Sequence, residues 1–160
     1  MSPIPALFTI LDLVVTNLRA TPGYVNPATG KGIPVFDGPI DGTQDNPLSY
    51  VCVGWTPSGD VAGTIHTLPA VFGTRADRFE EGTFDAVAVA SAGYTAPSPV
   101  RATLQTIVAD LTTAAYGLTA ATFDAYWCEI SAFDLRQFQS PNGVTVEATV
   151  SFSYRVQQGA

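Results

Sequence analysis

The stretch VTVEATVSFSYRV, from Val144 to Val156, decides how this chain folds. Its apolar and polar residues alternate without a break, which predicts one β-strand with an apolar face and a polar face. At about 3.3 Å per residue the strand would be roughly 40 Å long, whereas most strands have about 5–6 residues. Since a chain of 160 residues cannot easily cover both ends of such a strand, we expect part of it to meet other subunits.

A turn immediately before this stretch predicts a hairpin. Ser140-Pro141-Asn142-Gly143 combines residues that favour tight turns. The segment Tyr126–Leu135 is predicted to be a strand, although Glu129 and Asp134 interrupt its alternation. The turn would fold this segment back onto the long terminal strand.

Two helices are predicted by their apolar spacing and their end signals. The first is expected to begin with Ser2 as N-cap and Pro3 at the first helical position, and to stop at 21–23. The second is expected to open at Ser98-Pro99 by the same rule. Gly117 then suits the left-handed position that follows many helices.

Three further strands complete the predicted elements. They are Ile33–Phe36, Tyr50–Trp55 and Thr83–Ala92, of which the second is apolar enough to be buried on both faces. Long loops are expected at about 21–48 and 56–76. The mixture predicts a single α+β domain over residues 1–160, a two-layer sandwich in which two helices pack on one face of a mostly antiparallel or mixed sheet.

The composition limits the classes of partner. Hydrophobic residues make up 46% of the chain and charged residues only 13%, with a net charge of -7. The negative charge argues against general binding of nucleic-acid phosphates. The low charge density favours a surface that is covered by other proteins over an ordinary Ser/Thr-rich surface that is exposed to water. No apolar run reaches the roughly 20 residues of a membrane-spanning helix, and the start lacks a basic leader, so we expect a chain made and kept in a cytoplasm.

No catalytic, cofactor-binding or metal-binding set is recognisable. The chain lacks a Cys-x-x-Cys spacing, phosphate-binding glycine motifs and a Gly-x-Ser-x-Gly elbow. His66, the only histidine, is expected to be a loop residue. Cys52 and Cys128 are expected to be buried thiols, although two positions leave a disulfide open.

A cluster of charges precedes the strand at Thr83. Arg75, Arg78, Glu80 and Glu81 fit either a solvated strand end or a patch that sets the register between subunits, and we favour the patch.

Several segments together resemble a known family. They are Val35–Pro39, Val51–Trp55, Phe72–Glu81, Ser98–Arg101 and Val150–Val156. In order and spacing these segments are similar to the tail terminators, or tail completion proteins, of long-tailed bacteriophages, of which the lambda-type terminator is one. The resemblance covers nearly the whole chain, apart from a long, weakly polar insertion at Thr56–Thr74.

The resemblance implies a structural protein of the virion without enzymatic activity or cofactors. It implies a ring, commonly of six subunits, at the head-proximal end of the tail tube, where it ends tube polymerisation and joins the tail to the head connector or stopper protein. The partners would be further copies of this chain, the tail tube protein and the connector, with no membrane and no specific nucleic-acid binding, although DNA passes through such a ring. Interface residues would be Arg75, Arg78, Glu80, Glu81 and Arg155.

Two alternatives stay open. A tail-tube or head–tail stopper protein also builds rings from long strands, and copy number per particle would separate it from a terminator. A small ligand-binding module or enzyme would instead use the loop around His66 and would need a concave pocket with convergent polar groups.

Overall fold

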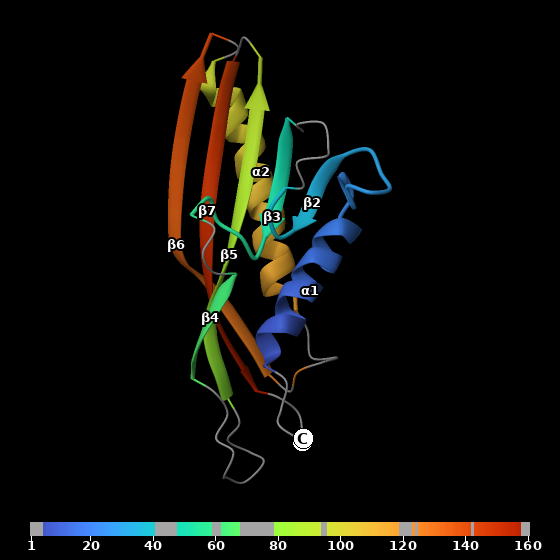
Figure 1. Cartoon of the computed structure of the whole chain (residues 1–160), viewed down its shortest axis with the longest axis vertical. Coiled ribbons are helices and arrows are strands. Elements are labelled where there is room, and N and C mark those ends of the chain that lie inside the picture. The colour runs from blue at the N-terminus through green and yellow to red at the C-terminus, as the bar shows by residue number, and fades with distance from the viewer. Residues whose placement is uncertain are drawn as a thin grey trace.

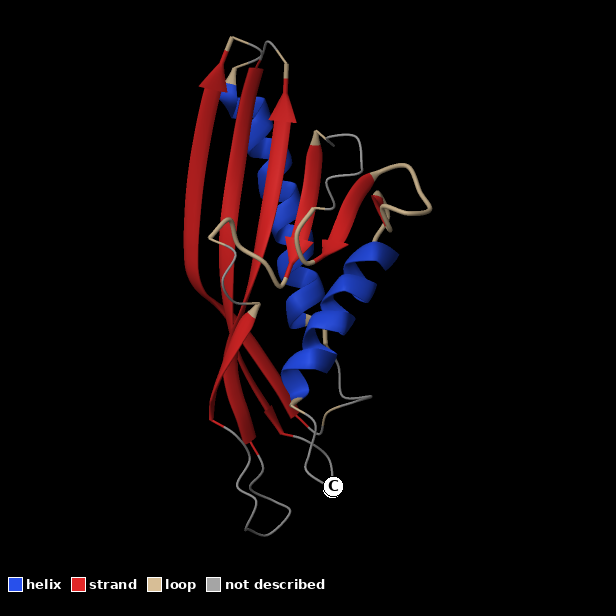
Figure 2. Ribbon diagram, in the orientation of Figure 1, coloured by secondary structure: helices blue, strands red, loops and turns tan. Residues whose placement is uncertain are grey.

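The computed structural model describes residues 5–40, 48–58, 62–67, 79–93, 96–118, 123, 125–141 and 143–157. It contains two helices and seven strands (Figures 1 and 2). In chain order they are α1 (Ala6–Ala20), β1 (Tyr24–Val25), β2 (Ile33–Asp37), β3 (Ser49–Val53), β4 (Gly63–Thr67), β5 (Phe79–Ala92), α2 (Pro97–Tyr116), β6 (Ala125–Ser140) and β7 (Gly143–Gln157). The predicted α+β class is confirmed.

The seven strands form one mixed sheet, in which six follow the order β1-β2-β3-β5-β7-β6 and β4 pairs with β5 off this path. The pairs β1–β2 and β2–β3 are parallel, and all other pairs are antiparallel. Along one side of β5, β4 pairs with residues 81–84 and β3 pairs with residues 86–90. The other side of β5 pairs with β7 over its whole length, so these two strands form the centre of the sheet.

The long terminal strand has the predicted two faces. Its even-numbered side chains from Val144 to Val156 are buried, and the odd-numbered ones are partly or fully exposed. β6 folds back along β7 through the predicted turn, from Ala125 beside Gln157 to Ser140 beside Gly143. The hairpin is therefore confirmed, and both of its strands are longer than those of most proteins.

The two helices lie on one face of the sheet, where they enclose the main core. Phe84 of β5 and Phe152 of β7 stack at 5.0 Å between ring centroids in its middle. Burial of each such ring contributes about 1.5–3 kcal/mol. A smaller cluster on the opposite face contains Phe36, Cys52 and Val87, so β3 is buried on both faces as predicted.

The helix ends differ from the predictions. α1 begins at Ala6, after Pro5, and the predicted cap residues Ser2 and Pro3 lie outside the described residues. α2 begins two residues earlier than expected, with Ala96 as N-cap in place of Ser98 and Pro97 at the first helical position in place of Pro99. Gly117 has φ −80°, so the prediction of a left-handed position there is wrong; its N–H instead closes the last turn onto the carbonyl of Thr113.

Two predicted loops contain strands. β4 lies inside the predicted 56–76 loop, and β1 lies inside the predicted 21–48 loop. Both strands are short, and β4 is held by antiparallel pairing with β5. Tertiary pairing thus makes strands of segments whose local sequence resembles a loop.

Candidate functional site

The outer side of β6 is the most exposed part of the described sheet. This strand has 16 residues and pairs with β7 along one side, while no strand in the described part of the chain pairs with its other side. Large apolar side chains along it are half-exposed: Trp127, Ile130, Phe133, Leu135 and Phe138. A long edge strand with exposed apolar residues is a template for pairing with another chain.

A bulge divides β6 into two segments and decides where these side chains point. The pairing with β7 shifts between Ile130 and Ala132. Below the bulge Ile130 lies opposite Phe152, and above it Phe133 lies opposite Val150. Because Phe152 and Val150 are buried, Ile130 and Phe133 both point to the buried face of the sheet. The backbone N–H of Ile130 donates to the hydroxyl of Tyr116 on α2 (3.1 Å). Figure 1 shows that β6 bends about halfway along its length.

Above the bulge, α2 covers β6 incompletely. A small groove of about 160 Å³ lies between them, lined by Leu104 and Val108 of the helix and by Phe133 and Leu135 of the strand. Arg101 also lines the groove, and its side chain donates a hydrogen bond to Gln137 (3.2 Å). The apolar face of β6 therefore remains open to a partner beside α2.

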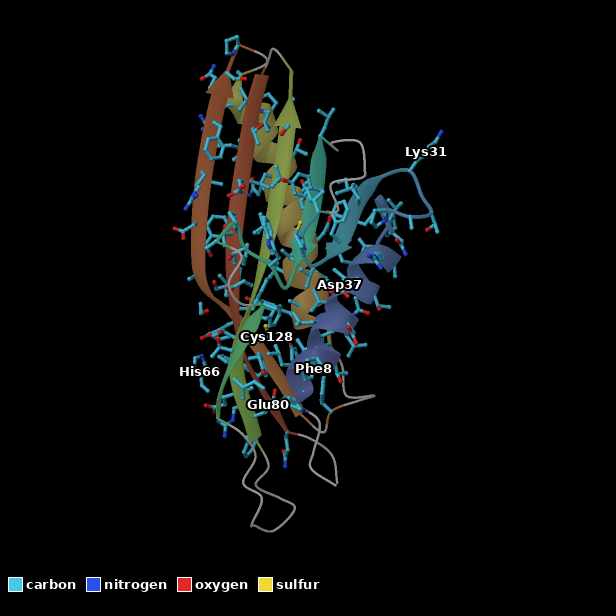
Figure 3. The ribbon with its side chains drawn as sticks, viewed as in Figure 1. Phe8, Lys31, Asp37, His66, Glu80 and Cys128 are labelled. Carbon is cyan, nitrogen blue, oxygen red and sulfur yellow. The ribbon has the colours of Figure 1, made fainter. Side chains whose placement is uncertain are left out.

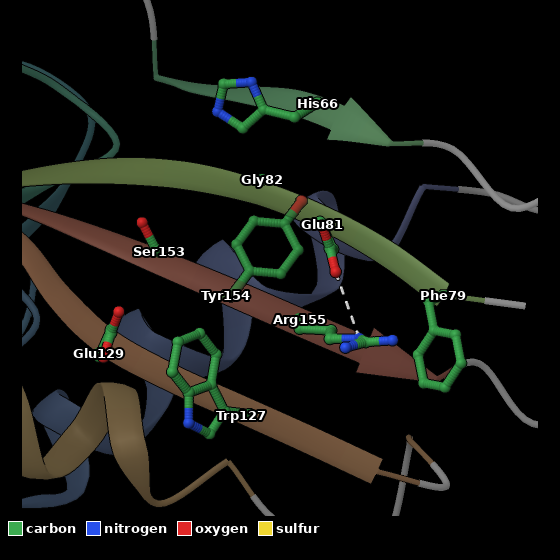
Figure 4. A pocket seen from close by; sticks show the side chains of 9 residues that line it. All are labelled: His66, Phe79, Glu81, Gly82, Trp127, Glu129, Ser153, Tyr154 and Arg155. Atoms are coloured by element: carbon green, nitrogen blue, oxygen red, sulfur yellow. Dashed lines mark ion pairs between the residues drawn. The ribbon is translucent and has the colours of Figure 1, made fainter.

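The opposite face of the sheet, without helices, has a wide hollow of about 880 Å³ at its lower end (Figure 4). His66 of β4 lies at one rim, and Trp127 and Glu129 of β6 lie at the other. Between them Arg155 of β7 pairs with Glu81 of β5, with 3.3 Å from Nε to Oε1. The Arg155 guanidinium also lies 4.1 Å from the ring centroid of Phe79 in β5, a cation–π contact.

This arrangement brings together two of the five predicted interface residues. Glu81 and Arg155 are about half-exposed and face each other across β5 and β7. Arg75 and Arg78 lie outside the described residues. Because exposed ion pairs contribute roughly 0–1 kcal/mol to stability, the pair is better suited to orienting a partner than to holding the fold.

Glu80 does not lie on the surface of the chain. Its side chain is 0% exposed, and its carboxylate accepts hydrogen bonds from the backbone N–H groups of Ala6 (2.7 Å) and Leu7 (3.0 Å) and from the hydroxyl of Tyr154 (2.7 Å). It therefore satisfies the first N–H groups of α1, which lacks a side-chain cap of its own. The placement of Glu80 in a surface patch is corrected: it is a structural residue of the core (Figure 3).

A second hollow of about 490 Å³ lies on the same open face. Polar side chains line it, among them Asp85, Asp134, Arg136 and Ser151. The Ser151 hydroxyl donates to Asp85, so this carboxylate is engaged inside the protein. Within the residues that the structure describes, no group of three or more His, Cys, Asp or Glu side chains could hold a metal ion.

The cysteines are free thiols in the structure. Burial raises the pKa of Cys52 to about 12 and that of Cys128 to about 11. A raised pKa lowers the thiolate fraction and with it the reactivity of the thiol. Neither cysteine has the environment of a catalytic nucleophile.

The residues that sequence reasoning missed are the exposed apolar side chains of β6. Phe133 and Leu135 alternate with Asp134 and Arg136, which is the pattern of a half-exposed strand, and Phe138 follows after the predicted end at Leu135. An alternating apolar pattern at the edge of a sheet was the signal that could have identified them.

In the described part of the chain, no helix is both long and apolar enough to span a membrane. No protein-family model and no curated protein matches this chain.

Proposed function

We propose that this chain is a structural subunit that joins with copies of itself into a ring, and that the ring is the tail terminator of a long-tailed phage virion. The observation that carries the proposal is the outer edge of β6, which is long, uncharged over much of its length and open to pairing. Such edges are usually blocked by charges, prolines or a covering element, or are closed by assembly.

The apolar side chains along β6 support assembly over solvent exposure. Leu135 is 51% exposed and Phe138 is 53% exposed, and aromatic and aliphatic anchors of this kind dominate protein interfaces. A head-to-tail contact between identical copies closes into a ring when its rotation divides a full turn. The sequence resemblance to tail terminators then suggests six copies and the position at the head-proximal end of the tail tube.

The open hollow around His66 gives less support to a ligand-binding function. Its floor is the surface of three strands, and its strongest polar groups, Glu81 and Arg155, pair with each other. No hydrogen bond joins His66 to a carboxylate or hydroxyl within the described residues. A specific pocket instead needs several polar groups that converge on a buried ligand.

Light scattering coupled to size-exclusion chromatography tests assembly directly, at micromolar and at millimolar protein concentration. The proposal expects a discrete multimer whose negative-stain images show rings. The proposed ring would be overturned if the chain stayed monomeric at every concentration and was present as a single, isolated copy in assembled particles.

Copy number per particle distinguishes the terminator from its alternatives. A terminator supplies a single ring, so quantitative mass spectrometry of purified particles should find a few copies, whereas a tube protein is present in many rings. When added to polymerising tail tube protein, a terminator also limits tube length. Purified chain that polymerises by itself into long tubes would instead identify a tube protein.

A further inference from the structure

The lower half of the sheet consists of four antiparallel strands in the order β4-β5-β7-β6. Rows of paired residues cross all four strands, for example Ile65, Gly82, Tyr154 and Cys128. In the described part of the chain, the outer side of β4 and the outer side of β6 both lack a paired strand. This small sheet therefore ends in two open edges.

The directions of these two edges suit each other. β4 and β5 are antiparallel, β5 and β7 are antiparallel, and β7 and β6 are antiparallel. It follows that β6 runs opposite to β4. When one copy is placed beside another by rotation about an axis along the strands, β6 of the first meets β4 of the second in antiparallel orientation, the commoner and slightly more stable pairing.

The lengths of the two edges also suit each other. The bulge at Ile130–Ala132 bends β6, and the hydrogen bond from Ile130 to Tyr116 occupies a backbone N–H there. Below the bulge, the segment Ala125–Ile130 offers six residues to a partner. β4 (Gly63–Thr67) offers five, with an irregularity in its pairing with β5 between Ile65 and Thr67.

The two edges do not bring like charges together. The side chains of β4 include no carboxylate, lysine or arginine, and Glu129 is an exposed charge on β6. The chain has a net charge of -7, and like charges directly opposite each other destabilise a sheet. Pairing with β4 instead places Glu129 beside hydroxyls and an imidazole, and Trp127 supplies an aromatic anchor.

We propose that neighbouring copies of this chain join by antiparallel pairing of β6 residues 125–130 of one copy with β4 residues 63–67 of the next, so that their lower sheets become continuous. This inference rests on the proposed ring, and it names the two strands that build the ring. It makes the contact head-to-tail, since β6 and β4 are different surfaces. A contact between two β6 strands would instead be self-complementary and would stop at a dimer.

Disulfide trapping tests the junction, because a disulfide requires Cβ atoms about 3.5–4.5 Å apart. In a Cys128→Ala background, Thr64→Cys is combined with Trp127→Cys or with Glu129→Cys, all on the open face of the sheet. Thr64→Cys with Arg136→Cys is the matched control, since Arg136 lies above the bulge. After mild oxidation, at least one of the first two pairs should give a covalent ladder from dimer to the full ring, and the single variants and the control should not.

Light scattering on the same samples separates the two proposals. Multimers without a ladder from either pair would overturn the β6–β4 junction and leave the ring intact. If a single variant, Trp127→Cys or Glu129→Cys, forms covalent dimers, the contact lies between two β6 strands. That result would also overturn the β6–β4 junction. Monomers in every sample, including the parent chain, would overturn the proposed ring itself.

Discussion

The hydroxyl of Tyr154 donates a 2.7 Å hydrogen bond to the buried carboxylate of Glu80, and the same carboxylate accepts the first N–H groups of α1. One side chain on β5 thus joins β7 to the start of the N-terminal helix. Charged hydrogen bonds of this kind are stronger than neutral ones, and a buried partner left unpaired costs about 1–3 kcal/mol. The junction is therefore a point where the helical layer is fixed to the sheet.

Replacing Glu80→Gln should lower the free energy of unfolding by about 1–3 kcal/mol, because the amide keeps the shape but loses the negative charge beside the helix N-terminus. Urea unfolding followed by circular dichroism measures the change. Glu81→Gln is the matched control, since its half-exposed side chain should contribute less than about 1 kcal/mol. Equal effects of the two substitutions would contradict the capping role of Glu80.

Alkaline pH should destabilise the chain through its buried tyrosines. Burial is the main cause that raises the pKa of Tyr24 and of Tyr154, with further contributions from hydrogen bonds to Asp110 and Glu80 respectively. The folded state therefore holds the two hydroxyl protons more tightly than the unfolded state does. The stabilising contribution of the two tyrosines is complete below pH of about 10. Above that pH the free energy of unfolding declines by about 1.4 kcal/mol per pH unit for each tyrosine.

Unfolding by urea at a series of pH values up to 12 checks this dependence. Tyr24→Phe should make the decline above pH of about 10 less steep, because the phenylalanine has no proton to lose. A stability that is constant across this range would contradict the prediction.

The two thiols should react slowly at pH 8 and in a fixed order. Cys52 is fully buried with its pKa raised to about 12, and Cys128 is partly buried with its pKa raised to about 11. Labelling with a thiol-exchange reagent should therefore modify Cys128 first, and Cys52 only when the chain opens. Both thiols should react at once in urea, and rapid labelling of Cys52 in native buffer would contradict its burial.

Trp127→Lys should prevent assembly at little cost to the fold. The side chain is 51% exposed on the outer strand, so the free energy of unfolding should change by about 0.5–1 kcal/mol. A lysine on an edge strand disfavours pairing with a further chain, and the multimer measured by light scattering should dissociate. Thr16→Lys, at an exposed position of α1, adds the same charge and should leave the multimer unchanged.

The sequence predicted the main features of the fold where local pattern and tertiary structure agree. The alternation of 144–156, the turn at 140–143 and the apolar stripes of the helices identified β7, the hairpin and the helical layer. β4 was missed because its five residues lie in a stretch, 56–76, with many glycines and prolines, and because Gly63 weakens the strand signal; pairing with β5 makes it a strand.

The site was less predictable for two physical reasons. The bulge after Ile130 reverses the alternation of β6, so that residues on one face are odd-numbered above it and even-numbered below it. The burial of Glu80 depends on a helix that lies 74 residues away in the sequence. In this part of β5, every second side chain points to the buried face, as that of Phe84 does. Counting back from Phe84 to Gly82 and then by two more residues would have placed Glu80 on that face.

The capping of α1 from β5 also constrains the order in which the chain acquires structure during synthesis. α1 leaves the ribosome long before Glu80 has been translated, and a helix of 15 residues without its own cap is only marginally stable in water. Native docking of this helix must therefore wait for the middle of the chain. We expect nascent chains that end before β5 to remain accessible to chaperones and proteases.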